Sequence, residues 1–305
     1  MEQNILVSVI IPNYNHSAFL EERIESVLSQ TYQNYEIIIL DDASTDNSKE
    51  IIEKYRENTS VKTIIYNKKN SGRIFSQWQK GIRLAKGELI WIAESDDKCK
   101  KDLLEKLVTE FQKDEKLSVA FCKTIAFYDN GNESRINPIP CERNLHFSNH
   151  VFISQYMTKG CPMLNASACL FKKSIALEIE DLYSDMKGAG DRMFWVEMCE
   201  KGNIAIVNEW LNLMRFHLTN STKKHNLDGT NQKDDKVILD YIFKQKYINK
   251  AEYDQLRFRY AKYHIFQMIE DKHLKQELYK IWGISAIDKM RLKIDAWCNK
   301  ILKAI

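Results

Sequence analysis

The sequence predicts an α/β protein built on a mostly parallel, doubly wound sheet with flanking helices, followed by a C-terminal helical appendage. Four short apolar runs in the first hundred residues alternate with stretches of helical periodicity. Strands that alternate with helices at this spacing are typical of βαβ units, which place their strands parallel. Two of the runs are followed by paired carboxylates. Open α/β sheets bind ligands at the carboxyl ends of their strands, so these carboxylates stand where a ligand is expected.

The expected elements follow one another in a regular order. Each apolar run is bounded by turn or charged residues and is short enough to be a strand buried on both faces. The strands cover residues 6–11, 36–40, 61–66 and 89–93, and the helices between them cover residues 17–28, 46–55 and 73–85. Pro12 ends the first strand, and Gly87 closes the third helix.

The second half of the chain carries fewer strand signals. A helix is expected at 102–113 and a strand at 118–127. Residues 130–160 are polar and irregular, and we interpret them as a loop over the site. From about residue 232 the composition is helical. We therefore divide the chain into a domain of residues 1–225 and a C-terminal helical region of residues 226–305.

The composition limits the class of protein. The 305 residues are 44% hydrophobic and 29% charged, as in a globular protein with a substantial core. The seven cysteines are scattered without a Cys-x-x-Cys pair, which argues against a disulfide framework and a structural zinc site. A net charge of +3 is too small to indicate a nucleic-acid partner. Because no apolar run approaches the roughly 20 residues of a membrane span and no basic leader is present, we expect a cytoplasmic protein.

Acidic residues follow two of the strands directly. Asp41 and Asp42 end the second strand, and Glu94, Asp96 and Asp97 end the fourth. Since parallel strands bring such ends to one rim, we expect a crevice there. The three carboxylates after the fourth strand could hold a hard divalent cation and, through it, a diphosphate. The glycine-rich loops of dinucleotide-binding folds and of P-loop enzymes are absent from the sequence. The alternative is a solvated turn in which Asp97 caps the next helix.

An ordered set of segments carries a resemblance to a known family. The set consists of residues 9–15, residues 26–32, residues 36–46, the Asn70-x-Gly72 turn and the Glu94-x-Asp96-Asp97 segment. In this order and spacing they resemble the family 2 inverting glycosyltransferases. The resemblance is dense over residues 1–100 and looser to about residue 220. It implies a GT-A fold that binds a nucleotide-diphosphate sugar.

The resemblance implies a role for each residue around the donor. The turn from Pro12 to Tyr14 packs against base and ribose. Asp41 accepts the imide N–H of a uracil base, and Asp42 either joins it or orders the turn. Arg73, at the start of a helix, suits an anion, although it can also be a mere surface charge. The whole implied nucleotide-sugar site is Pro12, Tyr14, Asp41, Asp42, Gly72, Arg73, Glu94, Ser95 and Asp96.

The resemblance also implies a metal site. Asp96 matches the metal ligand of the family's D-x-D segment, and Glu94 or Asp97 assists it, with Glu94 standing where the family has an aspartate. His217, which follows an apolar strand, is either structural or a further ligand. The expected cofactor is Mn²⁺ or Mg²⁺, because both prefer the oxygen ligands that carboxylates and a diphosphate offer.

Asp191 is the residue that the resemblance makes the general base. Family members usually carry an acidic pair here. Gly190 occupies the first position of that pair, and Asp191 occupies the second, catalytic one. In this role Asp191 takes the proton from the acceptor hydroxyl. The alternative is that Asp191 caps a helix, and the two roles are compatible.

The C-terminal tail carries an apolar stripe with basic flanks. Residues 286–305 contain five basic and two acidic side chains, which accounts for the whole net charge of +3. The stripe consists of Ile287, Met290, Ile294, Trp297, Ile301 and Ile305. Three interpretations stay open: contact with an anionic membrane surface, pairing with another helix, or packing against the chain's own domain. The oligomeric state also stays open.

The function that follows is that of an inverting glycosyltransferase. It moves a sugar from a nucleotide-diphosphate sugar, with UDP as the expected nucleotide, to a hydroxyl of a surface glycan or lipid-linked glycan by single displacement. One alternative is a nucleotidyltransferase, which needs a glycine-rich basic loop where this chain has residues 12–16. The other is a non-catalytic sugar-nucleotide-binding subunit, which Glu94 and Gly190 favour.

Overall fold

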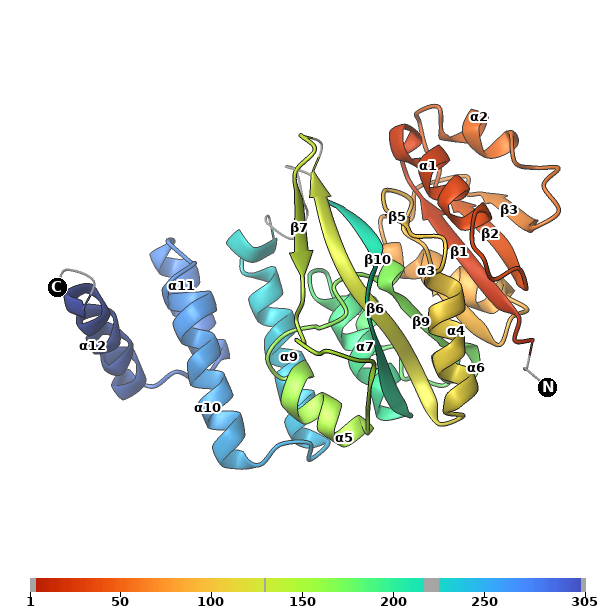
Figure 1. Cartoon of the computed structure of the whole chain (residues 1–305). Helices are drawn as coiled ribbons and strands as arrows, with labels where there is room; N and C mark the ends of the chain where they lie inside the picture. The colour runs from red at the N-terminus through yellow and green to blue at the C-terminus, as the bar shows by residue number, and fades with distance from the viewer. Residues whose placement is uncertain (1–3, 129, 217–224, 303–305) are drawn as a thin grey trace.

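The computed structural model describes residues 4–128, 130–216 and 225–302, with side chains as far as residue 295. Within these residues the strands form one ten-stranded sheet. The strand order is β3-β2-β1-β4-β9-β6-β10-β5, with β7 beside β6 and β8 beside β10. The sheet occupies one part of the molecule, and the C-terminal helices extend away from it (Figure 1).

The first four strands form the doubly wound part of the sheet. They are β1 (Val7–Asn13), β2 (Tyr35–Asp41), β3 (Val61–Tyr66) and β4 (Leu89–Ile92). β1 pairs in parallel with both β2 and β4, and β2 pairs in parallel with β3. Every residue of β1, β2 and β4 is buried, as expected of strands that are covered on both faces. The predicted α/β class and doubly wound arrangement are confirmed.

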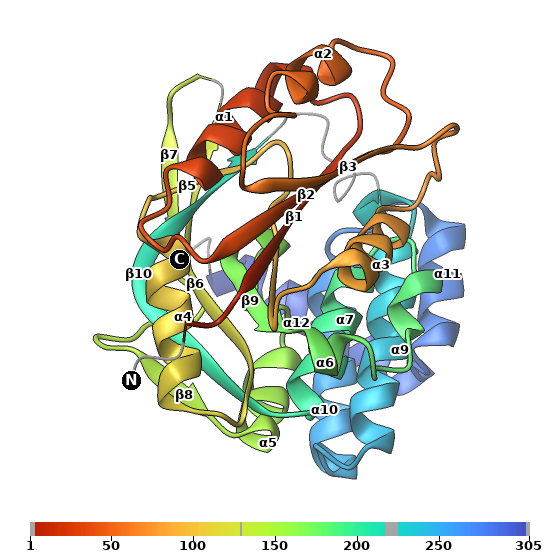
Figure 2. The same cartoon turned by 90° about the vertical axis from the view of Figure 1, so that its right-hand side faces the viewer.

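Helices cover both faces of these strands. α1 (Ser17–Leu28) and α2 (Ser48–Glu53) lie on one side, and α3 (Ile74–Leu84) lies on the other (Figure 2). α1 buries Leu20, Ile24 and Val27, which are the apolar positions expected from its periodicity. Since both faces are covered, a ligand can reach these strands only at their ends.

The remaining strands make the sheet mixed. They are β5 (Lys98–Cys99), β6 (Leu117–Tyr128), β7 (Glu133–Ile136), β8 (Leu145–Phe147), β9 (Cys169–Lys172) and β10 (Asn203–Phe216). β9 lies between β4 and β6 and is antiparallel to both, whereas β6 and β10 are parallel. The predicted parallel pairing therefore holds for β1 to β4 and again between β6 and β10. The short strands β5, β7, β8 and β9 add antiparallel pairs, so the sheet as a whole is mixed.

The segment predicted as an irregular loop contains structure. Within residues 130–160 the chain forms β7, β8, α5 (Asn149–Phe152) and a π-helix at Ile153–Met157. β7 and β8 are only four and three residues long, and each pairs with the edge of a longer strand. Strands this short and this exposed carry no clear alternation, which is why the pattern missed them.

α7 (Gly190–Glu200) is a buried helix behind the sheet. All its residues from Arg192 to Cys199 are buried. Phe194 and Trp195 make edge-to-face contacts with Phe171 of β9, with ring centroids 5.4 and 5.7 Å apart. Trp78 of α3 also contacts Phe194, at 5.5 Å. These aromatic contacts fix α7 against both the sheet and α3.

The C-terminal region is helical, as predicted. It consists of α9 (Thr230–Lys244), α10 (Lys250–Tyr260), a π-helix at Ala261–Phe266, α11 (Lys272–Ile281) and α12 (Ala286–Leu302). α9 packs against α7, and α12 is outermost (Figure 1). β10 ends at Phe216 and α9 begins at Thr230, on either side of the expected boundary at residue 225, and the division into domains stays a prediction. None of the helices described here is long and apolar enough to cross a membrane.

One buried carboxylate on α7 lacks a full set of partners. Glu197 is 2% exposed, and its Oε2 has no hydrogen-bond partner among the described residues. Burial raises the pKa of Glu197 from 4.5 to about 7. Since its folded-state pKa lies above the usual value, the folded protein holds this proton more tightly than the unfolded chain does. The free energy of unfolding therefore falls as the pH rises from 4.5 to about 7.

Glu197→Gln is expected to stabilise the protein at alkaline pH. At pH 8.5 the glutamate is ionised while buried, and the amide avoids that cost, so the free energy of unfolding should rise by on the order of 1 to 3 kcal/mol. The gain should shrink towards pH 5, where the folded glutamate is protonated. Urea unfolding at both pH values measures this, with the exposed Glu178→Gln as control. An equal gain at both pH values would contradict the assignment.

Candidate active site

A pocket opens at the carboxyl ends of β1 and β4. The turn after β1, the loop before α3 and the turn after β4 enclose it. The residues that line it are Pro12, Asn13, Tyr14, His16, Asp42, Asn70, Gly72, Arg73, Ile74, Gln77, Glu94 and Ser95. The structure thus brings together seven of the nine residues predicted to bind the nucleotide sugar. His16 and Gln77 carried no sequence signal, because a single polar residue in a turn or on a helix is unremarkable.

Tyr14 and Arg73 are two of the exposed residues of this pocket. The Tyr14 ring is 45% exposed, although it lies beside buried strands. An exposed aromatic ring of this kind offers a face on which a base can stack. The Arg73 guanidinium is also largely exposed and lies 3.7 Å from the Asp185 carboxylate. Both side chains are therefore accessible from the open side of the pocket.

Asp41 and Asp42 face different partners. Asp41 is almost fully buried, and its two oxygens accept hydrogen bonds from Asn13 Nδ2 (2.8 Å) and from the Ser44 backbone N–H (2.9 Å). It therefore ties the end of β2 to the end of β1. The predicted contact between Asp41 and the base stays a prediction.

Asp42 holds the loop that leads to α3. Its carboxylate accepts hydrogen bonds from Asn67 Nδ2 (2.6 Å), from the Ser71 hydroxyl (2.7 Å) and from Gln77 Nε2 (2.9 Å). The Ser71 backbone N–H also donates to it. Asp42 thus orders the wall of the pocket that carries Gly72 and Arg73. Of the two roles foreseen for Asp42, the ordering role accounts for these bonds.

Arg23 of α1 supports the acidic turn after β4 from below. Its fully buried guanidinium donates to the Glu94 backbone carbonyl (2.8 Å) and to the Ser167 hydroxyl (3.1 Å), and it lies 3.8 Å from Asp97. Asp97 also accepts hydrogen bonds from Asn165 Nδ2 and from the Arg215 backbone N–H. Burial raises the pKa of Asp97 to about 6, and the Arg23 charge opposes this rise.

This inward orientation bears on the metal prediction for Asp97. Both of its oxygens accept hydrogen bonds from the protein, and the residue is buried. Asp97 therefore joins the sheet to the acidic turn. In the structure it positions this turn, and its expected role as an assisting metal ligand stays a prediction. The alternative role as a helix cap is not observed, since α4 (Leu103–Lys113) has Asp102 at its N-cap position.

Glu94 lines the pocket and also contacts Trp78 of α3. Its Oε1 accepts a hydrogen bond from Trp78 Nε1 (3.0 Å). Burial, together with the negative charges of Asp96 and Asp97, raises the pKa of Glu94 to about 8. The three carboxylates of this turn are thus close enough to repel one another. A bound cation is the natural means of relieving such repulsion.

The side chains around this acidic turn fit a hard cation only in part. Glu94 lines the pocket, whereas Asp96 does not and lies near enough to raise the pKa of Glu94. Both carry carboxylate oxygens, which is the ligand type that Mn²⁺ and Mg²⁺ prefer. The described residues contain no group of three or more His, Cys, Asp or Glu that could hold a metal ion by themselves. His217, the predicted further ligand, lies outside the described residues. A metal at Asp96 would thus need other ligands, such as phosphate oxygens and water.

Asp191 lies in the first turn of α7. The N-cap position belongs to Ala189, so Asp191 does not cap the helix, and its carboxylate suits the positive end of the helix dipole. Its Oδ1 accepts a hydrogen bond from the Arg192 backbone N–H (2.8 Å). Burial raises the pKa of Asp191 above its usual value. A raised pKa makes the carboxylate a stronger base, which suits proton abstraction from a hydroxyl.

Packing explains the glycine that precedes this aspartate. A Cβ on Gly190 would lie 2.5 Å from the Phe75 ring and 2.8 Å from the Tyr183 carbonyl oxygen. The Phe75 ring contacts Trp78 and Tyr183 at centroid distances of 5.2 and 5.5 Å. The space of the first acidic side chain of the family pattern is therefore filled by Phe75. Gly190 is a packing adaptation, and it leaves Asp191 in place.

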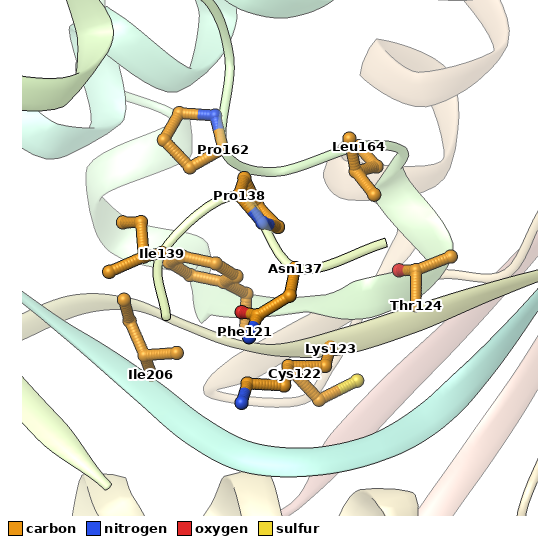
Figure 3. A pocket seen from close by; sticks show the side chains of 10 residues that line it. All are labelled: Phe121, Cys122, Lys123, Thr124, Asn137, Pro138, Ile139, Pro162, Leu164 and Ile206. Carbon is orange, nitrogen blue, oxygen red and sulfur yellow. The ribbon is translucent and has the colours of Figure 1, made fainter. Parts of the chain in front are cut away.

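A second, smaller pocket lacks catalytic groups. Figure 3 shows it between β6, β10 and the segments 137–139 and 162–164. Its titratable members are Cys122 and Lys123. Burial raises the pKa of the Cys122 thiol to about 12, and the Lys123 ammonium is bound to Asn208. The pocket at the ends of β1 and β4 is therefore the better candidate.

Comparison with known proteins identifies the family. The family model described as Glycosyl transferase family 2 matches residues 8–179, which is more than half of the chain. The chain belongs to glycosyl transferase family 2. The matched residues include the whole pocket at the ends of β1 and β4 and end before Asp191. The predicted family is thus confirmed, and the role of Asp191 stays a prediction.

The relatives of this family 2 chain include bacterial glycosyltransferases. Glycosyltransferase GlyG of Streptococcus pneumoniae is 41% identical over 107 residues, which cover 35% of each chain. The putative teichuronic acid biosynthesis glycosyltransferase TuaG of Bacillus subtilis is 37% identical over 116 residues, which cover 38% of this chain and 45% of TuaG. The match therefore spans less than half the length of both relatives.

A solved structure supports the fold of this family 2 chain. Staphylococcus aureus TarS 1–349 in complex with UDP-GlcNAc superposes with a TM-score of 0.65 at 16% identity, over 93% of this chain and 78% of that one. Similarity at this level of identity concerns the fold alone. It confirms the GT-A type of fold that the resemblance implied.

Proposed function

We propose that the protein is an inverting glycosyltransferase that moves a sugar from a nucleotide-diphosphate sugar to a hydroxyl group of a glycan. The observation that carries the proposal is a convergence of two halves. The pocket at the ends of β1 and β4, here called the donor pocket, lies with its acidic turn on one side of Trp78. The helix α7, which carries the proposed base Asp191, packs on the other side. Trp78 hydrogen-bonds Glu94 and packs on Phe194, so it joins the two halves.

On the donor side, each residue has a task in binding. Tyr14 stacks on the base and Pro12 packs beside it, while Arg73 contacts the phosphates. Asp96, assisted by Glu94, would hold Mn²⁺ or Mg²⁺, which would neutralise the negative charge of the departing diphosphate. UDP is the preferred nucleotide of the proposal, because TarS, which shares the fold, is solved with UDP-GlcNAc.

On the acceptor side, Asp191 acts as the general base. Its carboxylate takes the proton of the acceptor hydroxyl as that oxygen attacks the anomeric carbon. The bond from the anomeric carbon to the phosphate oxygen breaks, and its electron pair leaves with the nucleoside diphosphate. Attack comes from the face opposite the nucleotide, so one displacement inverts the configuration. The mechanism requires no protein nucleophile.

A non-catalytic sugar-nucleotide-binding subunit is the second candidate. Glu94 and Gly190 were the two features in its favour. The packing of Phe75 against Gly190 gives that glycine another reason, and Glu94 remains in favour of this candidate. A nucleotidyltransferase is disfavoured, since the turn from Pro12 to His16 offers no glycine-rich basic loop for a triphosphate.

A donor screen tests the proposal. Melting temperatures are measured with UDP-, GDP- and CMP-linked sugars, each with Mn²⁺ and with EDTA, because a ligand that binds the folded state stabilises it. UDP-sugars with Mn²⁺ are expected to give the largest shift. Transfer to glycan acceptors and donor hydrolysis are then assayed for the best ligand. A protein that binds a donor but neither transfers nor hydrolyses it would be a binding subunit, and one that binds none would overturn both candidates.

The acceptor is proposed to be a surface glycan at a membrane. Within the described side chains, Ile287, Met290 and Ile294 of α12 are 68%, 58% and 50% exposed, while Leu292 is buried. The predicted stripe therefore does not pack on the chain's own domain over this stretch. Arg291 and Lys293 are exposed beside it. An exposed apolar stripe with basic neighbours suits an anionic membrane surface, at which a lipid-linked acceptor would lie.

Aspartates in this stripe are expected to release the protein from membranes. Ile287→Asp combined with Ile294→Asp should lower binding to phosphatidylglycerol-containing vesicles at least about 10-fold. The variant loses two apolar side chains that would enter the membrane and gains two charges that anionic lipids repel. Co-sedimentation measures binding, with neutral phosphatidylcholine vesicles for comparison. The matched control is Val237→Asp, an exposed apolar position on α9. The proposal would be contradicted if the wild-type protein does not bind anionic vesicles and instead dimerises through this stripe.

A further inference from the structure

Helix α9 holds the segment of chain that leads to Asp191. One oxygen of Asp234, Oδ2, accepts hydrogen bonds from the backbone N–H groups of Lys187 (3.2 Å), Gly188 (2.7 Å) and Ala189 (3.0 Å). Three successive amides that converge on one carboxylate form an anion-binding nest. Hydrogen bonds to an ionised acceptor are stronger than neutral ones, so this contact restrains segment 187–189.

The packing between α9 and this segment leaves no room for a side chain. A Cβ on Gly188 would overlap the side-chain amide of Asn231, which lies one helical turn before Asp235. The backbone of segment 187–189 therefore lies directly on α9. This close approach accounts for a glycine at position 188 and allows the Asp234 carboxylate to reach the three amides.

The next residue of α9 holds the chain on the other side of Asp191. The Asp235 carboxylate pairs with the Arg192 guanidinium, which also donates to the Met157 carbonyl (2.5 Å). The second oxygen of Asp235 accepts a hydrogen bond from the Tyr260 hydroxyl. The Tyr260 ring stacks on the buried Trp282 at a centroid distance of 4.0 Å. Arg192 is thus anchored to the centre of the C-terminal helical region.

Two consecutive carboxylates of α9 therefore bind the chain immediately before and after the base. We propose that α9 is a positioning element of the active site, in which Asp234 and Asp235 fix the orientation of Asp191 toward the acceptor. Neither residue needs to touch a substrate. The inference rests on the proposed function. It also assigns a catalytic purpose to a helical region that lies outside the residues matched by the family model.

Small displacements of a catalytic group are costly, which is why such a support matters. A reacting group has to be held within about 0.5 Å of its productive position, and a shift of about 1 Å can cost on the order of 100-fold in rate. Among the described residues, the Asp191 side chain itself makes a hydrogen bond only with its neighbour, the Arg192 N–H. Its orientation thus depends on the backbone from 187 to 192, which Asp234 and Asp235 hold.

Asp234→Ala tests the inference directly. It removes the acceptor of three hydrogen bonds, and kcat for sugar transfer should fall about 10- to 100-fold while the Kd of the donor stays within twofold. Asp234→Asn keeps an acceptor oxygen and should restore most of kcat. The matched control is Asp240→Ala, which removes a carboxylate of the same helix whose partners are Lys236 and Tyr253. The control should keep kcat within twofold.

Hydrogen exchange separates this inference from the proposed function. The amides of residues 187–192 should exchange faster in Asp234→Ala than in the wild type. In Asp240→Ala their exchange rates should be unchanged. If the wild type transfers no sugar, the proposed function fails, and the exchange rates still decide whether Asp234 holds the segment. The inference is overturned if Asp234→Ala keeps wild-type kcat or exchange. It is also overturned if donor affinity and kcat fall together, because that pattern indicates general damage.

Discussion

Replacing Asp191 with asparagine is expected to abolish most sugar transfer while leaving donor binding intact. The amide has the same shape and still accepts the hydrogen bond from the Arg192 N–H, but it cannot take a proton from the acceptor. Loss of a general base costs about 100- to 10,000-fold in rate. Release of nucleoside diphosphate in the presence of acceptor measures kcat, and calorimetry measures the Kd of the donor.

The control for this experiment lies at the other end of the same helix. Glu200 of α7 accepts a hydrogen bond from the Tyr241 hydroxyl, so Glu200→Gln changes one carboxylate of α7 without touching the base. It should keep kcat within about twofold. An Asp191→Asn variant that retains more than a tenth of wild-type kcat would show that another group takes the proton. A variant that loses donor affinity instead would place Asp191 on the donor side.

The position of the donor pocket was predictable, because its residues follow strands whose arrangement in the sheet can be inferred from the alternation of strands and helices along the chain. Apolar runs that alternate with helices place the ends of β1 and β4 at one rim, so the turn at Pro12 and Tyr14 had to meet the turn at Glu94. No such rule fixes which way a carboxylate in that rim points. Asp42 faces the loop before α3, and Asp97 faces Arg23 and Asn165, because of residues far away in the sequence.

The acceptor half depended on contacts that local patterns do not encode. β9 enters the sheet antiparallel between β4 and β6, although its four residues carry no mark of direction. The glycine at position 190 departs from the family pattern. Its reason lies more than one hundred residues earlier in the sequence, because the ring of Phe75 fills the space that a side chain at position 190 would need. Likewise, Asp234 is one acidic residue among many on a helix surface, and only the fold brings it to segment 187–189.

Asp96 and Asp97 are adjacent, yet their substitutions are expected to fail in different ways. Asp96→Asn weakens the proposed hold on the cation and should lower kcat/KM at least about 100-fold, with little change in melting temperature, because electrostatic stabilisation of a leaving group is a large part of such catalysis. Asp97→Asn instead leaves the buried Arg23 without its charge partner. Breaking a buried ion pair costs about 3 to 5 kcal/mol, so the melting temperature should fall.

Donor binding with and without metal distinguishes the two variants. In the wild type, the thermal shift produced by UDP should be larger with Mn²⁺ than with EDTA. Asp96→Asn should lose this difference while keeping the smaller, metal-independent shift that Tyr14 and the rest of the pocket provide. Asp97→Asn should keep the difference from a lower starting temperature, since the Asp97 carboxylate is engaged with Arg23 and Asn165. The reverse pattern would move the metal from Asp96 to Asp97 and would require the buried carboxylate to turn outward when the donor binds.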